Sequence, residues 1–338
     1  MENRPVPYNA FVATSLEQLY QRLVPHGPAD WRHAVDILAP SIHEIDRNAT
    51  RIWFAFFPLE LHLAAEQADD RAAFVRKYGL MGRWRLADQI DTSHHFLFAH
   101  RYWPQVKTNL QTFADAHSDG DLPALVTAIA DRAARTARVD RELLLGLTAV
   151  ALMTLRQVGA AAFEAAPGRV HLEPDVRARS PHQVLRARAR DDWQGPLGFL
   201  RGLKKRWTVT FDENTPGAAF MMISGQEIAS AAQHDQRDYR SRDPRCTPGE
   251  GPIPVECRSA SCGTCWVGVL GGAEKLSDVH PRDEGRRLKT FGYIDTDEPR
   301  PIIRLACQAR GSGAVSVVIP PWNGIIGALR KDQSAGTD

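Results

Sequence analysis

Cysteine is scarce in this chain and unevenly placed. Only five of the 338 residues are cysteine, and none of them lies before Cys246. That content is far too low for a fold held together by disulfides. The few thiols are therefore better candidates for ligands or reactive groups than for cross-links.

An excess of charge of one sign is also missing. The 42 lysine and arginine residues balance 40 aspartate and glutamate residues, which leaves a formal net charge of +2. A nearly neutral chain has no overall electrostatic attraction to nucleic acid or to an anionic membrane surface. We therefore expect no nucleic-acid partner.

Long hydrophobic runs are absent as well. The most apolar stretch, Leu143 to Leu155, is shorter than the roughly 20 residues that span a bilayer, so it predicts a buried helix and no transmembrane segment. The start of the chain, Met1 to Tyr8, lacks the basic end and apolar stretch of a secretory signal. We expect a cytoplasmic protein, in a reducing compartment where free thiols persist.

The length suggests about two domains, and the first, residues 1–165, shows the periodicity of helices. Leu16, Leu19, Tyr20 and Leu23 recur at helical spacing, and Phe54 to Leu63 is apolar on nearly every side. Further helices are expected at 70–78, 91–103, 106–116, 122–137 and 140–163. This pattern predicts an all-helical N-terminal domain, which we expect to dock a partner protein.

Residues 166–204 have a different composition, rich in arginine and interrupted by proline. We interpret them as a basic linker that contains one short helix near His182 to Arg190. Two roles are open for this linker. It is either a solvated connector or a docking surface for an acidic partner.

From Trp207 the hydrophobic period becomes two, which is typical of half-buried strands. Strands are expected at 207–211, 220–223, 266–270, 302–308 and 314–319, with a capped helix from Ser224 and another helix over Pro281 to Phe291. Residues 205–322 are therefore predicted to form a small domain of mixed helices and strands. Residues 323–338 are left as a C-terminal tail.

Four of the five cysteines have the spacing C-x4-C-x2-C followed by a distant fourth. They are Cys257, Cys262, Cys265 and Cys307. A structural zinc site usually takes its cysteines from two short C-x2-C knuckles, whereas this spacing is that of plant-type 2Fe-2S sites. Four thiolates bind two iron ions, two to each, so the loop between the first three must curl around the cluster. Curling directs backbone N–H groups toward the sulfurs and stabilises their negative charge.

The neighbouring residues extend this pattern. Cys257 to Cys265 is a loop of small residues, and Arg304-Leu-Ala-Cys307-Gln308 has the form of a fourth-ligand strand. Residues 205–322 thus resemble a plant-type 2Fe-2S ferredoxin domain, a β-grasp fold, and the resemblance does not extend to the helical part. It implies one 2Fe-2S cluster per chain, held by Cys257, Cys262, Cys265 and Cys307, with no catalytic residue and a reduction potential on the order of −400 mV. The fold class that follows is α+β, with an all-helical domain before a β-grasp ferredoxin domain.

Three features depart from the family or stand apart from the ligand set. Ala260 occupies a position where many members have glycine, so a positive φ there would be strained. The gap from Cys265 to Cys307 is longer than in photosynthetic ferredoxins, and its added helix lies where it could alter the choice of partner. Cys246, in a loop rich in proline and glycine, is expected to be a free thiol because the set of four ligands is already complete.

The N-terminal histidines are a weaker candidate site. His94, His95 and His100 do not share one helical face, and the chain contains no Glu-x-x-His pair. We therefore expect an electron-transfer protein that exchanges one electron with a partner oxidoreductase or reductase, rather than a stand-alone catalyst. A permanent iron–sulfur subunit of a larger complex, a redox sensor, and an enzyme with a second cofactor stay open as alternatives. The exposed rim Arg258 to Ser261 is the expected electron exit, and the two halves are expected to be separable.

Overall fold

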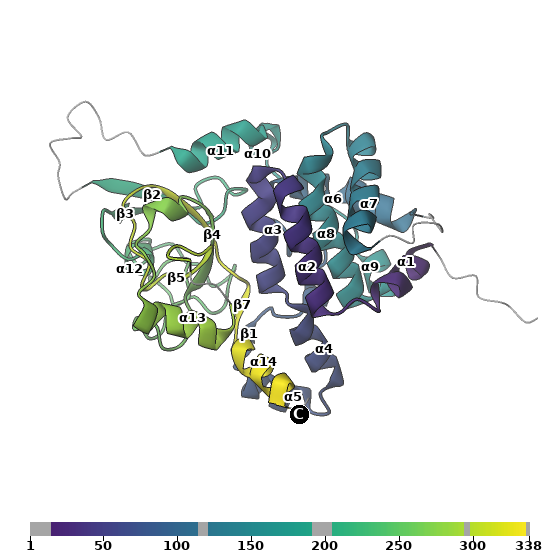
Figure 1. Ribbon diagram of the computed structural model, residues 1–338. Helices are drawn as coiled ribbons and strands as arrows, with labels where there is room; N and C mark the ends of the chain where they lie inside the picture. Colours follow the sequence, from purple (N-terminus) through teal and green to yellow (C-terminus); the bar gives the residue numbers. More distant parts are fainter. Residues whose placement is uncertain (1–14, 114–120, 191–204, 294–297, 336–338) are drawn as a thin grey trace, which may run out of the picture.

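The computed structural model of the chain describes residues 15–113, 121–190, 205–293 and 298–335. About half of the protein is helical, and the strands form a mixed five-stranded sheet. Figure 1 shows the N-terminal helices gathered on one side and the sheet on the other. No helix of the described ranges is both long and apolar enough to cross a membrane.

The helical half is built around one buried helix. Its helices are α1 (Ser15–Leu23), α2 (Pro28–Leu38), α3 (Glu44–Phe56), α4 (Leu59–Gln67), α5 (Arg71–Lys77), α6 (Trp103–Gln111), α7 (Leu122–Ala137), α8 (Arg141–Val158) and α9 (Ala160–Ala165). Every residue of α8 from Leu143 to Leu155 is buried, as the apolar run predicted. The helix expected over 140–163 is divided because Gly159, with φ +79°, ends α8.

The helix expected over 91–103 does not form. Turns occupy most of this segment, and only the 3₁₀ helix η3 (Phe98–Tyr102) is regular. The buried Asp46 carboxylate on α3 accepts the N–H groups of Phe98 at 2.6 Å and Ala99 at 2.8 Å. These backbone donors therefore bind a side chain 52 or 53 residues away instead of a helical carbonyl.

The sheet has the strand order β3-β2-β6-β4-β5. Its strands are β2 (Arg206–Thr210), β3 (Ala219–Ile223), β4 (Trp266–Gly271), β5 (Ile303–Leu305) and β6 (Val315–Val318), with only the pair β2–β6 parallel. The helices of this half are α12 (Ile228–Ala232) and α13 (Arg286–Phe291), the latter preceded by the π-helical turn η6 (Pro281–Gly285). The strands expected after Trp207 and the helix expected over 281–291 are therefore confirmed, with shorter bounds for several. The capped helix expected from Ser224 is wrong in its start, because residues 224 and 225 form a turn and α12 begins at Ile228, after Glu227 and without a side-chain cap.

The last residues are more than a tail. The short strand β7 (Trp322–Asn323) pairs with β1 (Met81–Gly82) of the helical half, and α14 (Ile326–Ala335) follows it. Arg330 on α14 bonds to Glu60 at 2.8 Å. The apolar side of this helix is also buried, so the C-terminal segment fastens the sheet half to the helical half.

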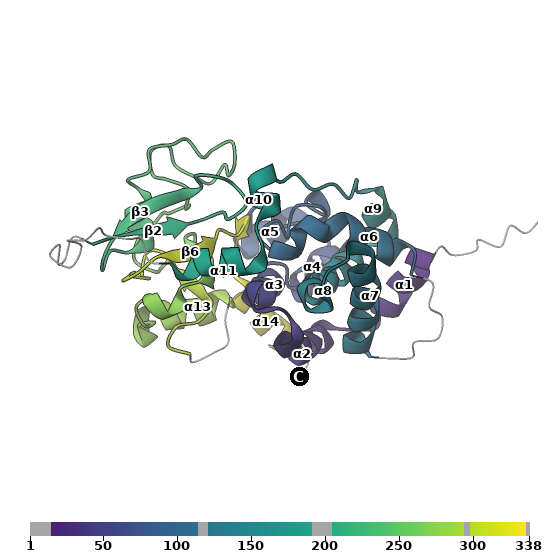
Figure 2. The same ribbon diagram turned by 90° about the horizontal axis from the view of Figure 1, so that it is seen from above.

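The basic linker forms helices α10 (Pro174–Ala178) and α11 (Pro181–Ala189), the second being the helix expected near 182–190; residues 191–204 lie outside the described ranges. Seen from above, α11 lies between α3 and the sheet (Figure 2). Arg188 on α11 is 7% exposed and binds the Glu213 carboxylate through two nitrogens, at 2.6 and 2.8 Å, and the Ile45 carbonyl at 2.8 Å. A buried guanidinium needs such partners, so this helix is not a simple solvated connector.

One hydrophobic core runs through both halves. Trp266 on β4 packs edge-on against Phe56 on α3, with ring centroids 4.9 Å apart. Gly268, two residues along β4, faces α3 so closely that a Cβ there would lie 2.6 Å from Cγ2 of Ile52. The shared core leads us to expect coupled folding of the two halves, whereas the sequence had suggested that they are separable.

Candidate metal centre

Strand pairing brings the two most distant candidate ligands together. Cys265 comes directly before β4, and Cys307 follows two residues after β5. Trp266 is paired with Leu305, and the Ala306 N–H donates to the Cys265 carbonyl at 2.9 Å. The register therefore places Cys265 beside Cys307.

The loop before β4 is curled by three residues in the left-handed region. Arg258, Ala260 and Gly263 have φ values of +54°, +59° and +74°. The positive φ considered for Ala260 is thus present, and it strains an alanine. The same conformation at Arg258 carried no signal in the sequence, because arginine is not a residue that marks such a position.

Because the loop is curled, its backbone N–H groups point at sulfur. The N–H groups of Ser261 and Cys262 donate to Sγ of Cys257, at 3.2 and 3.3 Å. The Thr264 N–H lies 3.5 Å from Sγ of Cys262. Hydrogen bonds of this kind stabilise sulfur that carries negative charge and tune the potential of an iron–sulfur centre.

The same contacts act on the thiol pKa values. Burial alone would raise the pKa of Cys257, but hydrogen bonds from Ser261, Ser259 and Cys262 outweigh it and lower the pKa to about 6. The hydrogen bond from Cys265 lowers the pKa of Cys307 to about 7, against the opposing effect of burial, and Gln308 and Ala260 contribute to this shift. Thiolate is the form that binds metal, so the site is prepared for ligation at these two positions.

The four thiols are arranged as two pairs, Cys257 with Cys262 and Cys265 with Cys307. Across the described residues, no three histidine, cysteine or acidic side chains are close enough to hold a single metal ion. Two pairs of thiolates, one for each iron, are what a binuclear iron–sulfur cluster requires. The residues present therefore fit such a cluster.

Exposure differs between the two pairs. Cys265 and Cys307 are 2% and 7% exposed, whereas Cys257 and Cys262 are only partly buried. Of the expected rim, Arg258, Ser259 and Ser261 are exposed, but Ala260 is buried at 2% exposure. The site thus opens to solvent on the side of the first two cysteines.

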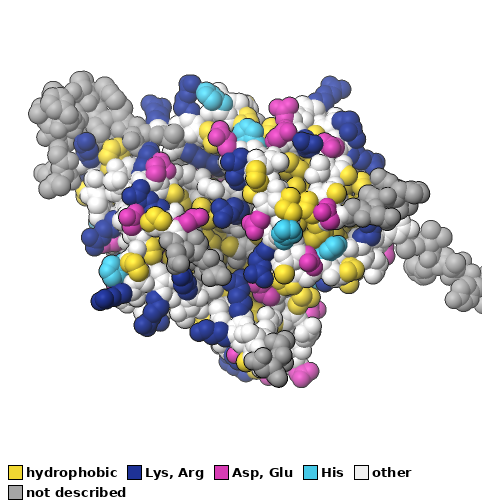
Figure 3. Space-filling view, in the orientation of Figure 1, with side chains coloured by type: hydrophobic (Ala, Val, Ile, Leu, Met, Phe, Trp, Pro, Cys, Tyr) yellow, Lys and Arg dark blue, Asp and Glu magenta, His cyan; other side chains and the backbone are white. Residues whose placement is uncertain are grey.

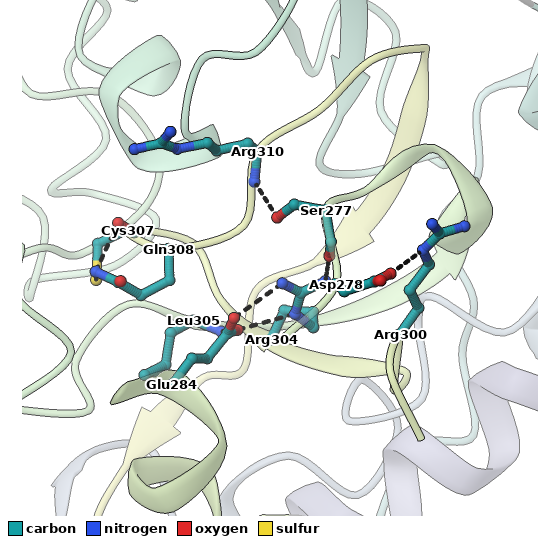
Figure 4. A network of polar contacts seen from close by, with 9 residues as sticks. All are labelled: Ser277, Asp278, Glu284, Arg300, Arg304, Leu305, Cys307, Gln308 and Arg310. Carbon is teal, nitrogen blue, oxygen red and sulfur yellow. Dashed lines mark hydrogen bonds and ion pairs between the residues drawn. The ribbon is translucent and has the colours of Figure 1, made fainter. Parts of the chain in front are cut away.

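A buried ion pair that the sequence did not reveal holds the strand before Cys307 (Figure 4). Arg304 binds both oxygens of Glu284 at 2.9 and 2.8 Å, and the two side chains are 0% and 1% exposed. Glu284 Oε1 also accepts the Leu305 N–H at 2.8 Å. Since Glu284 belongs to η6, this contact ties the segment between Cys265 and Cys307 to the strand that leads to Cys307.

Two more side chains approach the site. Nε2 of Gln308 lies 3.5 Å from Sγ of Cys307. The ring of Phe291 on α13 packs on Gly263, where a Cβ would come within 2.9 Å of the ring. The small residue at 263 is therefore needed both for its φ value and for this close packing.

Cys246 lies apart from these pairs. Its thiol is buried at 4% exposure and lies 3.4 Å from the Pro252 carbonyl, to which it donates. Burial raises its pKa to about 12. Cys246 is therefore a protonated thiol with no feature of a ligand or a reactive group.

The structure brings together two of the three histidines singled out in the sequence. Nδ1 of His94 lies 2.9 Å from Nδ1 of His100, and both side chains are buried. Nδ1 of His95 instead lies near the Thr92 carbonyl. Burial lowers the pKa of all three, which keeps the rings neutral.

Comparison with known proteins agrees with the geometry of the thiols. Residues 248–311 match the family of 2Fe-2S iron-sulfur cluster binding domains, and this range includes all four paired cysteines. The chain carries a 2Fe-2S cluster-binding domain. The resemblance of the C-terminal part to ferredoxins and the expected 2Fe-2S cofactor are thereby confirmed. No curated protein and no solved structure matches the chain.

Proposed function

We propose that this protein transfers single electrons to or from a partner oxidoreductase, using one 2Fe-2S cluster held by Cys257, Cys262, Cys265 and Cys307. When bound, the cluster supplies reversible uptake of one electron at low potential. The observation that carries the proposal is the pairing of the four thiols under backbone donors inside the matching domain.

The chain's own residues prepare and protect the site. The thiol pairs would supply two ligands for each iron, and the N–H groups of Ser261, Cys262 and Thr264 would stabilise the sulfur charge. Cys265 and Cys307 lie in the core and keep one side of the site away from water. No acid or base is needed for electron exchange, so we assign no catalytic residue.

We also propose that the fold of residues 205–322 is a β-grasp. The mixed sheet supports this, because its parallel pair β2–β6 joins the two ends of the domain and α12 follows the β2–β3 hairpin. The helical domain of residues 1–165 serves partner docking in this proposal. Within the linker of residues 166–204, Arg188 on α11 binds Glu213 and so fixes α11 to the sheet half.

Electrons leave through the exposed rim in this proposal. Ser259 and Ser261 are small and exposed, so a partner can approach closely beside the partly buried Cys257. Loops at the surface are common places for such contacts.

A bulky substitution tests the exit. Ser259→Trp is expected to slow oxidation of the reduced protein by an external acceptor while leaving the reduction potential nearly unchanged, as measured by stopped-flow absorbance and redox titration. Ser41→Trp, on the exposed surface of the helical half, is the matched control. Equal rates for both variants would exclude this exit, and a reduced protein that gives its electron to no acceptor would contradict the carrier function itself.

A further inference from the structure

The segment from η6 through α13 is strongly basic. Pro281 to Phe291 contains four basic residues, Arg282, Arg286, Arg287 and Lys289, and two acidic residues, Asp283 and Glu284. Figure 3 shows lysine and arginine side chains gathered over the lower left of the molecule, where Figure 1 places α13. This surplus is local, because the chain as a whole is nearly neutral.

The acidic residues of this segment do not neutralise its arginines. Glu284 is buried against Arg304, and Oδ2 of Asp283 lies 2.8 Å from Nδ1 of His280. The guanidinium groups of Arg282, Arg286 and Arg287 have no ion-pair partner within the described ranges. Arg282 and Arg286 are exposed and Arg287 is half-buried.

This basic segment is fixed to the cluster site. The Glu284 carboxylate accepts the Leu305 N–H, two residues before the ligand Cys307. At the other end of the segment, Phe291 packs on Gly263 of the cysteine loop. A partner bound to α13 would thus be held at a set distance from the cluster, without an intervening flexible linker.

The surface between the turn η6 and Cys307 is hollowed. The lining of a cavity of about 540 Å³ includes Cys307, Arg258, His280 and Asp283. The turn η6, which precedes α13, contributes Asp283 and Glu284 to this cavity, so the segment reaches the depression beside Cys307 through its acidic turn and not through its arginines.

We propose that Arg282, Arg286 and Arg287 form a docking surface for an acidic electron-transfer partner protein. The inference rests on the proposed electron-carrier function and adds the charge and position of the partner. Complementary charge raises the rate of encounter and fixes the orientation of two proteins, and salt weakens both effects. A negatively charged face is the partner surface that these three guanidiniums, which have no ion-pair partner among the described residues, would attract.

Two haem proteins of opposite charge serve as probes of this surface in the intact holoprotein. Acidic cytochrome b5 and basic cytochrome c are each mixed with the reduced protein at low and high salt, and the second-order rate of haem reduction is measured. The variant R286E/R287E reverses two charges of the surface. R32E/R135E is the matched control, since it makes the same charge change on exposed positions of α2 and α7, on the opposite side of the molecule.

We expect R286E/R287E to slow the reduction of cytochrome b5 by about tenfold or more at low salt, and this difference to shrink at high salt. The same variant should reduce cytochrome c faster than the wild type does. R32E/R135E should stay within about twofold of the wild type with both probes, because neither cytochrome is the native partner that the helical domain is proposed to dock. Visible absorption must show an equal cluster content in all three proteins.

Equal changes in both double variants would show that only total charge matters and would overturn the docking surface. Unchanged rates in R286E/R287E would overturn it as well. In both cases the wild type still transfers electrons, so the proposed function survives. A wild-type protein that reduces neither cytochrome after full reduction by dithionite would instead contradict the proposed function, and the docking inference with it.

Discussion

Trp266, which follows the proposed ligand Cys265, packs edge-on against Phe56 of the helical half, with ring centroids 4.9 Å apart. Both side chains are completely buried. The contact makes α3 part of the core on which the strand after Cys265 rests. The N-terminal half is therefore expected to stabilise the cluster site in addition to its proposed role in partner docking.

Phe56→Ala tests this relationship. The substitution should lower the free energy of unfolding by about 3–5 kcal/mol, because it opens a cavity in the shared core. Urea unfolding followed by far-UV circular dichroism and by the visible absorption of the cluster should give coincident transitions. Phe54→Ala, a half-buried position of the same helix, should leave the visible absorption spectrum unchanged. Two well-separated transitions in the wild type would show that the halves fold independently.

The buried pair of Glu284 and Arg304 should be far more important than a surface pair. Glu284→Gln leaves the Arg304 guanidinium uncompensated inside the protein, and we expect a loss of about 3 kcal/mol or more in the free energy of unfolding. The control is Glu66→Gln, which removes the exposed pair with Arg71 and should change stability by less than about 1 kcal/mol. Chemical denaturation measures both. Similar small losses in the two variants would mean that the buried pair does not hold the Cys307 strand.

Ala260→Gly should relieve backbone strain in the cysteine loop. Alanine at φ +59° is disfavoured by roughly 1–2 kcal/mol, and the greater freedom of glycine in the unfolded chain offsets part of the gain. We expect a net stabilisation of about 1 kcal/mol or less, measured by thermal unfolding of the holoprotein. Ala128→Gly within α7 should instead cost about 1 kcal/mol. Destabilisation by both substitutions to the same extent would argue against strain at Ala260.

Local patterns in the sequence predicted much of this structure, and contacts between distant residues account for the differences. Trp207, Val209 and Phe211 alternate as a half-buried strand should, and the cysteine spacing predicted the matching domain. The segment 91–103 looked helical because its apolar residues suggested it, yet the carboxylate of Asp46 takes the backbone donors. The partnership of Glu284 with Arg304 spans 20 residues and has no periodic signal. The left-handed Arg258 has none either.

The buried histidines make stability depend on pH. Burial, with a smaller effect of His95 and Arg101, lowers the pKa of His100 from 6.5 to about 3. Between pH 6.5 and 3, His100 therefore binds a proton in the unfolded chain but not in the folded protein. The free energy of unfolding is consequently highest above pH 6.5, with respect to His100, and decreases as the pH falls through this range. Burial raises the pKa of Asp46 to about 6 despite the hydrogen bonds from Ala99 and Phe98. Asp46 therefore has the opposite effect on the free energy of unfolding, which its titration increases as the pH falls.

His100→Gln separates the two effects. Between pH 6 and pH 4, the free energy of unfolding should depend less steeply on pH in the variant than in the wild type. The slope should be smaller by up to about 1.4 kcal/mol per pH unit. Urea denaturation at several pH values measures the slope, and His33→Gln on the exposed side of α2 is the matched control. A slope identical to that of the wild type would show that His100 titrates normally in the folded protein.

The assignment of the four ligands is tested most directly by counting iron and acid-labile sulfide in the purified protein and in two cysteine variants. Wild type and Cys246→Ser should each contain about two iron ions and two sulfides per chain, with the same visible absorption and the same electron paramagnetic resonance signal after reduction. Cys307→Ser should lose the cluster or change both spectra strongly, because Cys265 would be left without its paired ligand. Equal loss of iron in Cys246→Ser and Cys307→Ser, or a full and unaltered cluster in Cys307→Ser, would contradict the assignment.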